Sequence, residues 1–489
     1  MKGFDGKLVG SAYPITRDEC KMVHDAAIRV LEQGGVRCDD ERAATMFEDA
    51  GCKLENNREL VKIPEKVVMD ALAKCPASFT LHGRNDADLD CSIGTGEVHF
   101  CTVTGRYIDD IHSGERRKVT RQDAIDGTLM ADALENVHGL YKPVMWLYDE
   151  EMICNSQILT TEWMKHTNKP GTWVYNTGAE HEVSDLIRMW QIAAGGEEEM
   201  QQKPHMLGHV VVNPPRVIDV HYTDWLIGFC DSGTPLSIES ALMGGATGPA
   251  TRAGMLVQCM VEIYSLVVQS QSYKPGHPLA FCSFSPAMDM RTGLWATGTP
   301  EYGINGGGIA AMAKYHNIPV VGFGMSDSCE FDQQTAHEKA LKNYNYALAG
   351  LSWIIDLGGT AGFNLVSWPE MVLENEMAAY IGEYLKGIQV DEERLSVDTI
   401  LKVGPLPGSY MKEKHTRKWF REEFFMPELN NKEFFESWQR GHVELQEKAK
   451  QKALSILDNH QSPVAVEIQQ ELDSYLNFCL QRDLRKQAV

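Results

Sequence analysis

Short apolar, strand-like runs alternate with helix-like segments from about residue 125 to about residue 370. The helix-like segment 249–269 begins with a proline in its first turn, and Thr335 and Glu338 have the spacing of a capping box at the start of another helix. Eight strand positions separated by helices favour a (β/α)8 barrel of the TIM type, an α/β fold, over an open doubly wound sheet. The predicted strands are 139–148, 171–176, 205–212, 235–240, 278–284, 319–325, 353–357 and, with the weakest pattern, 363–368.

The segments on either side of the barrel have different patterns. Residues 1–124 combine helix-like stretches with short strand-like runs and the turn sequences GTGE and HSGE, which predicts an N-terminal α+β domain. The barrel is expected to occupy 125–410 as the catalytic domain, followed by a charged, helical C-terminal segment at 411–489. The last part of this segment, 463–484, is expected to pack either on the barrel or on another subunit. We also expect the protein to be a homo-oligomer.

The charge balance limits the possible partners. Among the 489 residues, 68 acidic side chains outnumber 46 Lys and Arg, which gives a net charge of −22. Such a surface repels nucleic acid and anionic membranes, so neither is expected as a partner. The 12 cysteines are scattered singly without a CxxC pair, which indicates reduced thiols and a cytoplasmic protein. We see no signal peptide, and the most apolar helix-like stretch, 255–268, contains Gln258 and Glu262 and is too short to cross a bilayer.

The usual sequence signatures of metal sites and catalytic nucleophiles are missing. His205 and His209 are four residues apart, but in a strand this spacing does not form a zinc-binding pair, and no third ligand is evident. The glycine-rich run 303–308 lacks the spacing and the lysine of a phosphate loop, which favours close helix packing or a tight turn. No GxSxG motif occurs, and no Cys and His can be paired by spacing. We therefore expect no bound metal and identify no catalytic side chain. A hydrolytic barrel, which would need a metal cluster or an acid/base pair, is the third alternative.

The ends of the predicted strands carry aromatic and acidic residues. In a (β/α)8 barrel the loops after the strands line one mouth, where active sites lie. An aromatic and acidic lining suits a quaternary ammonium ion, which donates no hydrogen bonds and is held by π faces and nearby carboxylates. Asp327 follows the apolar run VVGFGM, and the turn-like sequence SDS would project it into the mouth. The candidate substrate-binding residues at strand ends are Trp146, Tyr148, Tyr175, Asp327 and Glu330, and Glu239 and Asp289 lie at the ends of two further strands.

The segment 283–303, SFSPAMDMRTGLWATGTPEYG, follows the fifth predicted strand and is rich in large side chains. Its prolines and glycines exclude a long uninterrupted helix, so we expect a loop that shapes the mouth of the barrel. Arg291 would orient either a substrate carboxylate or a neighbouring loop. Trp295 and Tyr302 are further candidates for aromatic contact with a trimethylammonium group.

Three stretches of the sequence resemble the trimethylamine methyltransferase family. They are GGATGPATRAGMLVQCMVEIYSLVVQ at 244–269, FCSFSPAMDMRTGLWATGTPEYG at 281–303 and SDSCEFDQQTAHEKAL at 326–341. The resemblance extends over nearly the whole chain and is greatest to the branch that lacks pyrrolysine, which includes glycine betaine:corrinoid methyltransferases. Gln333 and Gln334 stand near the position where other relatives carry pyrrolysine, which disfavours trimethylamine as the substrate and makes Gln334 a candidate for substrate binding.

The resemblance implies transfer of a methyl group from a methylated amine to the Co(I) of a corrinoid (cobalamin) carried by a separate partner protein, with no cofactor bound by this chain alone. A quaternary amine leaves as a neutral tertiary amine, so neither a metal nor a general acid is needed to activate it, and the enzyme mainly positions and desolvates its substrate. Glycine betaine is the expected substrate, with proline betaine, carnitine or another methylated amine as alternatives. A non-catalytic betaine-binding or sensing protein is the alternative from another class, because an aromatic cage fits both.

Overall fold

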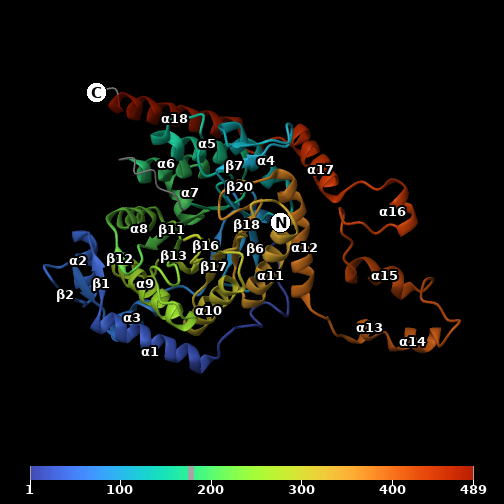
Figure 1. Ribbon diagram of the computed structural model, residues 1–489, viewed down its shortest axis with the longest axis horizontal. Coiled ribbons are helices and arrows are strands. Elements are labelled where there is room, and N and C mark those ends of the chain that lie inside the picture. Colours follow the sequence, from blue (N-terminus) through green and yellow to red (C-terminus); the bar gives the residue numbers. More distant parts are fainter. Residues whose placement is uncertain (1, 174–180, 488–489) are drawn as a thin grey trace.

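Eight parallel strands form a closed barrel at the centre of the protein (Figure 1). The computed structural model describes residues 2–173 and 181–487. The barrel strands are β6 (His99–Thr102), β9 (Leu140–Tyr141), β10 (Gly171–Trp173), β11 (Met206–Val212), β13 (Leu236–Ser240), β14 (Leu279–Ser283), β17 (Val320–Phe323) and β18 (Trp353–Leu357). They are neighbours in chain order, and the ring closes where β6 meets β9, through a parallel bridge between Cys101 and Gly139. The predicted (β/α)8 fold is therefore confirmed.

The first strand of the barrel, β6, lies within the segment 1–124 that the sequence pattern assigned to an N-terminal domain. It pairs with β18, with His99 opposite Trp353. The prediction that 363–368 supplies a barrel strand is wrong, because β20 joins a separate sheet. Since β6 is short and entirely buried, its sequence resembles that of any short strand, and only the pairing decides which sheet it joins. The separate sheet contains, in order, β19 (Gly359–Thr360), β20 (Leu365–Val366), β7 (Tyr107–Asp109) and β8 (Arg116–Lys118).

A helix follows each barrel strand. The eight helices are α4 (Arg121–Ala133), α5 (Asn155–His166, preceded by the 3-10 helix η2, Met152–Cys154), α6 (Glu182–Ala194, with the short α7, Glu197–Gln202, after it), α8 (Val220–Ser232), α9 (Arg252–Tyr273), α10 (Pro300–His316), α11 (Gln333–Ala349) and α12 (Trp368–Lys386). At the start of α11, Asp332 accepts hydrogen bonds from the backbone of Gln334 and Thr335. Asp332 is thus the N-cap, so the predicted capping box of Thr335 and Glu338 is wrong.

The glycines of α10 allow it to pack closely on α11. A Cβ atom added to Gly306 would lie 2.3 Å from the ring of Tyr346, so the two helices could not approach as they do with any larger residue at this position. The run 303–308 is helical, and close helix packing, one of the two structures expected for it, is confirmed.

The N-terminal segment packs against α9. Its elements are α1 (Arg17–Gln33), β1 (Val36–Cys38), α2 (Glu41–Asp49), β2 (Lys53–Glu55), β3 (Leu60–Lys62), α3 (Glu65–Leu72), β4 (Phe79–Leu81), the 3-10 helix η1 (Ala87–Leu89) and β5 (Cys91–Ile93). A small sheet of order β12-β1-β3-β2 includes β12 (Val217–Ile218) from the loop after β11. By length and composition α9 could cross a membrane, but most of it is buried inside the protein, as in the core helix of a barrel.

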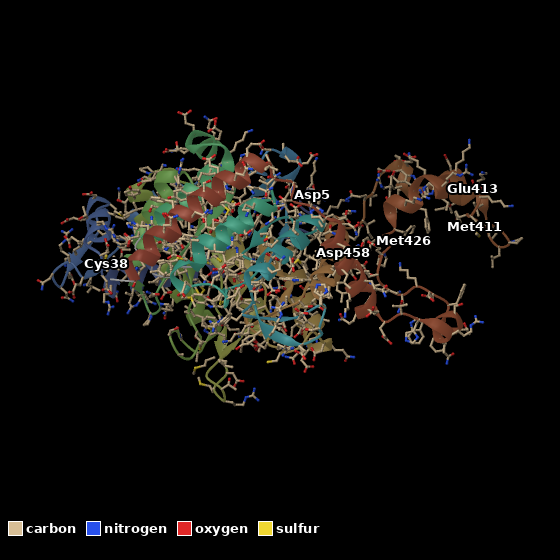
Figure 2. All side chains as sticks on the ribbon, turned by 90° about the horizontal axis from the view of Figure 1, so that it is seen from above. Asp5, Cys38, Met411, Glu413, Met426 and Asp458 are labelled. Carbon is tan, nitrogen blue, oxygen red and sulfur yellow. The ribbon has the colours of Figure 1, made fainter. Side chains whose placement is uncertain are left out.

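The C-terminal segment forms a projecting arm and then returns to the barrel (Figures 1 and 2). The arm carries α13 (Glu392–Leu395), α14 (Val397–Val403), α15 (Lys414–Glu423) and α16 (Phe435–Gly441), and the return consists of α17 (Leu445–Asn459) and α18 (Val466–Gln487). α17 packs on α12 and α4, and α18 packs on α5 and α6. An ion pair of 2.8 Å between Lys165 and Asp473 ties α18 to α5. Packing of 463–484 on the barrel, one of the two predicted arrangements, is confirmed.

Candidate active site

A cavity of about 1300 Å³ opens at the end of the barrel where the strands finish. Its inner part is lined by strand residues, among them His209 and Glu239. Its outer part is lined by loops, including the hairpin of β15 (Ala287–Met288) and β16 (Trp295–Ala296) that follows β14. This is the end at which (β/α)8 barrels carry their active sites.

One side of the cavity is an aromatic wall formed by Phe284, Trp295, Phe323 and Phe363. The ring of Phe284 is central: its centroid lies 4.9 Å from that of Trp295 and 5.9 Å from that of Phe323. Phe363, from the loop between β19 and β20, lies 5.8 Å from both Phe284 and Phe323. Clustered π surfaces of this kind attract quaternary ammonium groups.

Three polar side chains from neighbouring strands, His209, Glu239 and Cys282, meet at the inner end of the cavity, and we call them the inner cluster. Nε2 of His209 lies 3.1 Å from Oε2 of Glu239, and Sγ of Cys282 donates to the same oxygen at 3.1 Å. All three are buried, while His209 and Glu239 line the cavity. Burial and the nearby Glu239 carboxylate raise the pKa of the Cys282 thiol. The inner cluster therefore combines an imidazole, a carboxylate and a thiol within contact distance.

Asp327 connects two loops at the cavity. Its Oδ1 accepts hydrogen bonds from the backbone nitrogen and the hydroxyl of Thr297, which lies beyond β16. Its own backbone nitrogen donates to Oε2 of Glu338 at 3.0 Å, and Gln334 Nε2 donates to Oε1 of Glu338 at 2.8 Å. Asp327, Gln334 and Glu338 all line the cavity. This network holds a carboxylate at the position where the sequence pattern predicted one.

Arg291 lies at the tip of the hairpin between β15 and β16. Its side chain is 86% exposed and donates two hydrogen bonds to Asp289, at 3.0 and 2.7 Å. These hydrogen bonds hold the pKa of Asp289 down, at about 2. These contacts tie Arg291 to its own hairpin and not to a neighbouring loop, at the outer rim of the cavity, and orientation of a substrate carboxylate by Arg291 stays a prediction.

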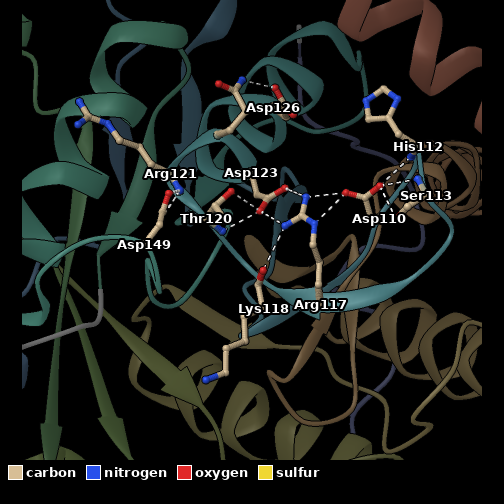
Figure 3. Close-up of polar contacts among 11 residues, drawn as sticks. Asp110, His112, Ser113, Arg117, Lys118, Thr120, Arg121, Asp123, Asp126 and Asp149 are labelled. Carbon is tan, nitrogen blue, oxygen red and sulfur yellow. Dashed lines mark hydrogen bonds and ion pairs between the residues drawn. The ribbon is translucent and has the colours of Figure 1, made fainter.

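On another side of the mouth, the hairpin of β7 and β8 is tied to the start of α4 by Arg117 (Figure 3). Its guanidinium donates to Asp110 at 2.6 Å and to both carboxylate oxygens of Asp123, at 2.7 and 2.8 Å. Asp123 in turn accepts from the backbone nitrogen of Thr120 at 2.7 Å, which caps α4. The loop after β6, which contributes Arg106 to the cavity, is therefore anchored to the barrel.

A family model described as trimethylamine methyltransferase (MTTB) matches this chain over residues 8–482. The chain belongs to the trimethylamine methyltransferase family. The match includes the N-terminal segment, the whole barrel and the arm, so the resemblance drawn from the three sequence stretches is confirmed. The aromatic cavity at the barrel mouth is the candidate active site of this member of the trimethylamine methyltransferase family.

Individual relatives in the trimethylamine methyltransferase family differ in the methylated amine for which they are named. The glycine betaine methyltransferase of Desulfitobacterium hafniense (strain Y51) is 28% identical to this chain over 98% of both proteins. The trimethylamine methyltransferase MttB of D. hafniense (strain DSM 10664 / DCB-2) is 29% identical, over 91% of this chain and 89% of that protein. Among solved structures, the monomethylamine methyltransferase MtmB of Methanosarcina barkeri aligns with a TM-score of 0.48 and 10% identity, over 93% of this chain and 95% of that chain.

The cavity brings together some of the sequence-predicted site residues. Those that line it are Trp146, Arg291, Trp295, Asp327 and Gln334. They come from loops that follow three different barrel strands and from the first turn of α11. Their convergence follows from the barrel, since parallel strands present all their following loops at one end.

Other predicted residues lie elsewhere. Tyr148 is exposed, outside the lining, with its ring 4.5 Å from Lys118 Nζ. Tyr302 is buried behind the aromatic wall, and its hydroxyl donates to the backbone oxygen of Phe323 at 2.6 Å, because a buried phenol needs a hydrogen-bond partner. Glu330 is exposed and outside the lining. Tyr175 lies outside the described residues.

Sequence reasoning missed most of the aromatic wall and Cys282. Phe284 and Phe323 lie at or just after the ends of β14 and β17, so the rule that selected Trp146 could have found them. Cys282 had a weaker signal, because it lies in a strand and its relation to Glu239 depends on register. In the structure these two residues are direct partners across β13 and β14.

Proposed function

We propose that this chain transfers a methyl group from a quaternary amine, with glycine betaine as the preferred substrate, to the Co(I) of a corrinoid carried by a partner protein. The observation that carries the proposal is the aromatic wall in the same cavity as the Asp327 carboxylate. Aromatic faces and a carboxylate together recognise a cation that cannot donate hydrogen bonds. Similarity to a protein named glycine betaine methyltransferase supports the choice of substrate.

In the proposed reaction the Co(I) atom attacks one methyl carbon while the bond from that carbon to nitrogen breaks. The bonding electron pair stays on nitrogen, so the products are methyl-Co(III) and a neutral tertiary amine, which is dimethylglycine when glycine betaine reacts. No proton has to be supplied to the leaving nitrogen. The residues of this chain would hold the ammonium group among the rings, exclude water and direct one methyl group toward the mouth.

The size of the cavity supports a methyl acceptor that enters from outside. At about 1300 Å³ it exceeds the range of about 300–1000 Å³ that is typical of sites for drug-sized ligands, and glycine betaine is smaller than such ligands. Room therefore remains at the outer end for part of a second molecule. We infer that the corrinoid arrives with its carrier protein and that this chain alone holds no corrinoid.

A substrate panel tests the proposal. The purified chain is mixed with a reduced corrinoid protein, and separately with free cob(I)alamin, and then with glycine betaine, proline betaine, carnitine or trimethylamine. We expect the absorbance change from Co(I) to methyl-Co(III) to be fastest with glycine betaine. Calorimetric binding of glycine betaine without methyl-Co(III) formation from any substrate would instead support a betaine-binding or sensing protein.

We also propose that the arm joins copies of the chain into a homo-oligomer. Several large apolar side chains on the arm are almost fully exposed, including Leu406 at 93%, Met411 at 88% and Phe434 at 85%. Apolar surface gathered on a projecting segment is characteristic of an interaction site. A cytoplasmic location is the remaining proposal, and the 12 free cysteines support it.

A further inference from the structure

We propose that the inner cluster of His209, Glu239 and Cys282 binds a divalent metal ion of the zinc type, whose fourth coordination position takes the carboxylate of the substrate. The proposal that the cluster binds a metal rests only on the geometry of the cluster. The part concerning the substrate rests on the proposed function, because it requires a substrate with a carboxylate.

The three possible ligand atoms already lie near the spacing that a metal ion would impose. They come from three adjacent strands, β11, β13 and β14, and all lie within 4.8 Å of one another. Around a tetrahedral zinc ion with bonds of about 2.0–2.3 Å, ligand atoms are separated by roughly 3.3–3.8 Å. The two separations of 3.1 Å to Glu239 Oε2 would therefore need only small outward shifts of the side chains.

The surroundings of His209 suit a metal ligand. Its Nδ1 lies 3.0 Å from the hydroxyl of Ser237, its direct partner on β13. When the ring donates its Nδ1 proton to this hydroxyl, Nε2 presents a lone pair toward the Glu239 carboxylate. In that tautomer the Nε2 lone pair and the carboxylate oxygen repel each other, and a cation between them would bind both atoms. Metal-bound histidines are commonly fixed through their second ring nitrogen in this way.

The donor set and its access to the cavity indicate the kind of metal site. Imidazole, thiolate and carboxylate together favour zinc or a similar transition metal over calcium or magnesium. Three protein ligands with one open position are typical of zinc sites that bind a substrate. The expectation of no metal rested on the lack of a third ligand near His205 and His209, and the pairing of three strands supplies ligands that their spacing in the sequence does not reveal.

The position of the cluster fits the carboxylate end of a betaine. His209 packs edge-on against Phe323 of the aromatic wall, with 5.7 Å between ring centroids. A substrate whose carboxylate binds the metal at the inner end would extend its trimethylammonium group along this wall toward the mouth. The metal would thus orient the substrate and would not contact the leaving nitrogen.

The first experiment measures metal binding without any substrate. Metal is removed from the full chain with a chelator, and the chain is then titrated with Zn²⁺ or Co²⁺. Bound metal is measured by inductively coupled plasma mass spectrometry. We expect one equivalent to bind, and the Co²⁺ form to show the charge-transfer absorbance of a thiolate ligand. Absence of stoichiometric binding by the folded parent chain would overturn the proposal.

Variants assign the metal to the cluster. Cys282→Ser should remove the charge-transfer absorbance, and Ser237→Ala should weaken metal affinity about tenfold. Cys259→Ser, a change at a buried cysteine outside the cluster, and Cys329→Ser, at an exposed one, should leave both properties unchanged. If Cys282→Ser does not fold, His209→Gln provides the second test. Unchanged binding in a folded Cys282→Ser or His209→Gln variant would place the metal elsewhere and refute the assignment.

The second experiment adds a substrate to the Co²⁺ form. Glycine betaine should change the Co²⁺ spectrum, whereas choline, which has the same ammonium group but no carboxylate, should not. An unchanged spectrum with betaine, although betaine binds, would refute the carboxylate contact and leave the metal site in place. The metal titration does not depend on catalysis, so failure of the proposed methyl transfer would be seen separately in the substrate panel.

Discussion

Thr297 donates two hydrogen bonds to Oδ1 of Asp327, one from its backbone nitrogen at 2.9 Å and one from its hydroxyl at 2.5 Å. The two residues lie in loops that follow different barrel strands, β14 and β17, so these bonds fix the position of one loop relative to the other. Because both bonds fall on one oxygen, the second oxygen can interact with a ligand in the cavity that Asp327 lines.

Replacing Asp327 by Asn should weaken substrate capture more than the chemical step. Asn keeps an oxygen that accepts from Thr297 but removes the charge that attracts the ammonium ion. This attraction weakens as positive charge leaves nitrogen in the transition state, so it does not accelerate the reaction. We expect KM to rise about fivefold, equivalent to about 1 kcal/mol, with kcat changed less than about twofold, in steady-state kinetics. A collapse of kcat with unchanged KM would show that Asp327 takes part in the chemistry.

Replacing Phe284 by Leu should weaken binding of quaternary amines. Leu keeps apolar bulk but removes the ring at the centre of the aromatic wall, which should cost about 0.5–2 kcal/mol in calorimetric titrations with glycine betaine. Trp295→Leu should have an effect of similar size. Tyr148→Leu is the matched control, because Tyr148 lies outside the cavity lining, and it should bind as tightly as the parent. Equal affinities for all three variants would rule out the aromatic wall as the ammonium site.

Two glycines of the same helix should respond in opposite directions to alanine. At Gly306 the new methyl group would meet the ring of Tyr346 at 2.3 Å, which should destabilise the protein by about 1–3 kcal/mol. At Gly303 its nearest neighbours would be 3.7 and 3.8 Å away, so the higher helix propensity of alanine should stabilise by up to about 1 kcal/mol. Thermal unfolding of the two variants beside the parent measures both effects. Equal midpoints would mean that α10 and α11 are not as closely packed as the structure shows.

Asp110 should stabilise the protein at neutral pH and lose this effect in acid. Hydrogen bonds from the backbone of Ser113 and from Arg117 hold its pKa below the usual range, although partial burial opposes them (Figure 3). A depressed folded-state pKa gives stability that is present above the unfolded pKa of about 4 and is lost as the pH falls through the folded value. Asp110→Asn should therefore cost about 1 kcal/mol near pH 7, with the difference in Tm from the parent shrinking below about pH 4.

Asp126 provides the contrast for this pH dependence. Burial raises its pKa, so its carboxylate stabilises the fold less as the pH rises through the unfolded value toward the folded one. Relative to the parent, Asp126→Asn should gain stability as the pH rises, opposite in sign to Asp110→Asn. The same trend in both variants would show that the tie of Arg117 to Asp110 does not set the acid stability of this hairpin.

A carboxylate in place of an exposed apolar side chain of the arm should break the proposed oligomer. Phe434→Asp places a carboxylate on a side chain that is 85% exposed, so folding should be little affected while burial against a second copy becomes unfavourable. Light scattering should show a lower molar mass for the variant than for the parent at the same concentration. Lys432→Asp, which changes a nearby polar residue, is the control and should retain the parent mass. If light scattering shows that the parent is a monomer, the proposed homo-oligomer is wrong.

Several barrel strands could be predicted nearly to the residue. The strand 353–357 is correct at both ends, and 205–212 and 235–240 each differ from the structure by one residue at the first position. Parallel strands covered by helices are buried on both faces, so they appear in the sequence as continuous apolar runs that can be recognised locally. The mouth position of Asp327 was predictable for a related reason, because it directly follows such a run.

Other features depended on contacts between distant parts of the chain. β6 belongs to the barrel because it pairs with β18 and meets β9. The four residues of β6 do not show in the sequence which strands they pair with. Tyr302 is buried because its hydroxyl donates to the Phe323 carbonyl, and Phe363 joins the aromatic wall from a loop that leads into β20, the strand that pairs with β7. The inner cluster exists because strand register sets Glu239 beside Cys282. The sequence by itself determined seven of the barrel strands, the fold class and the family, since these follow from local pattern and motif. Pairing and register, which are properties of the folded chain, decided the eighth strand and which side chains meet in the cavity.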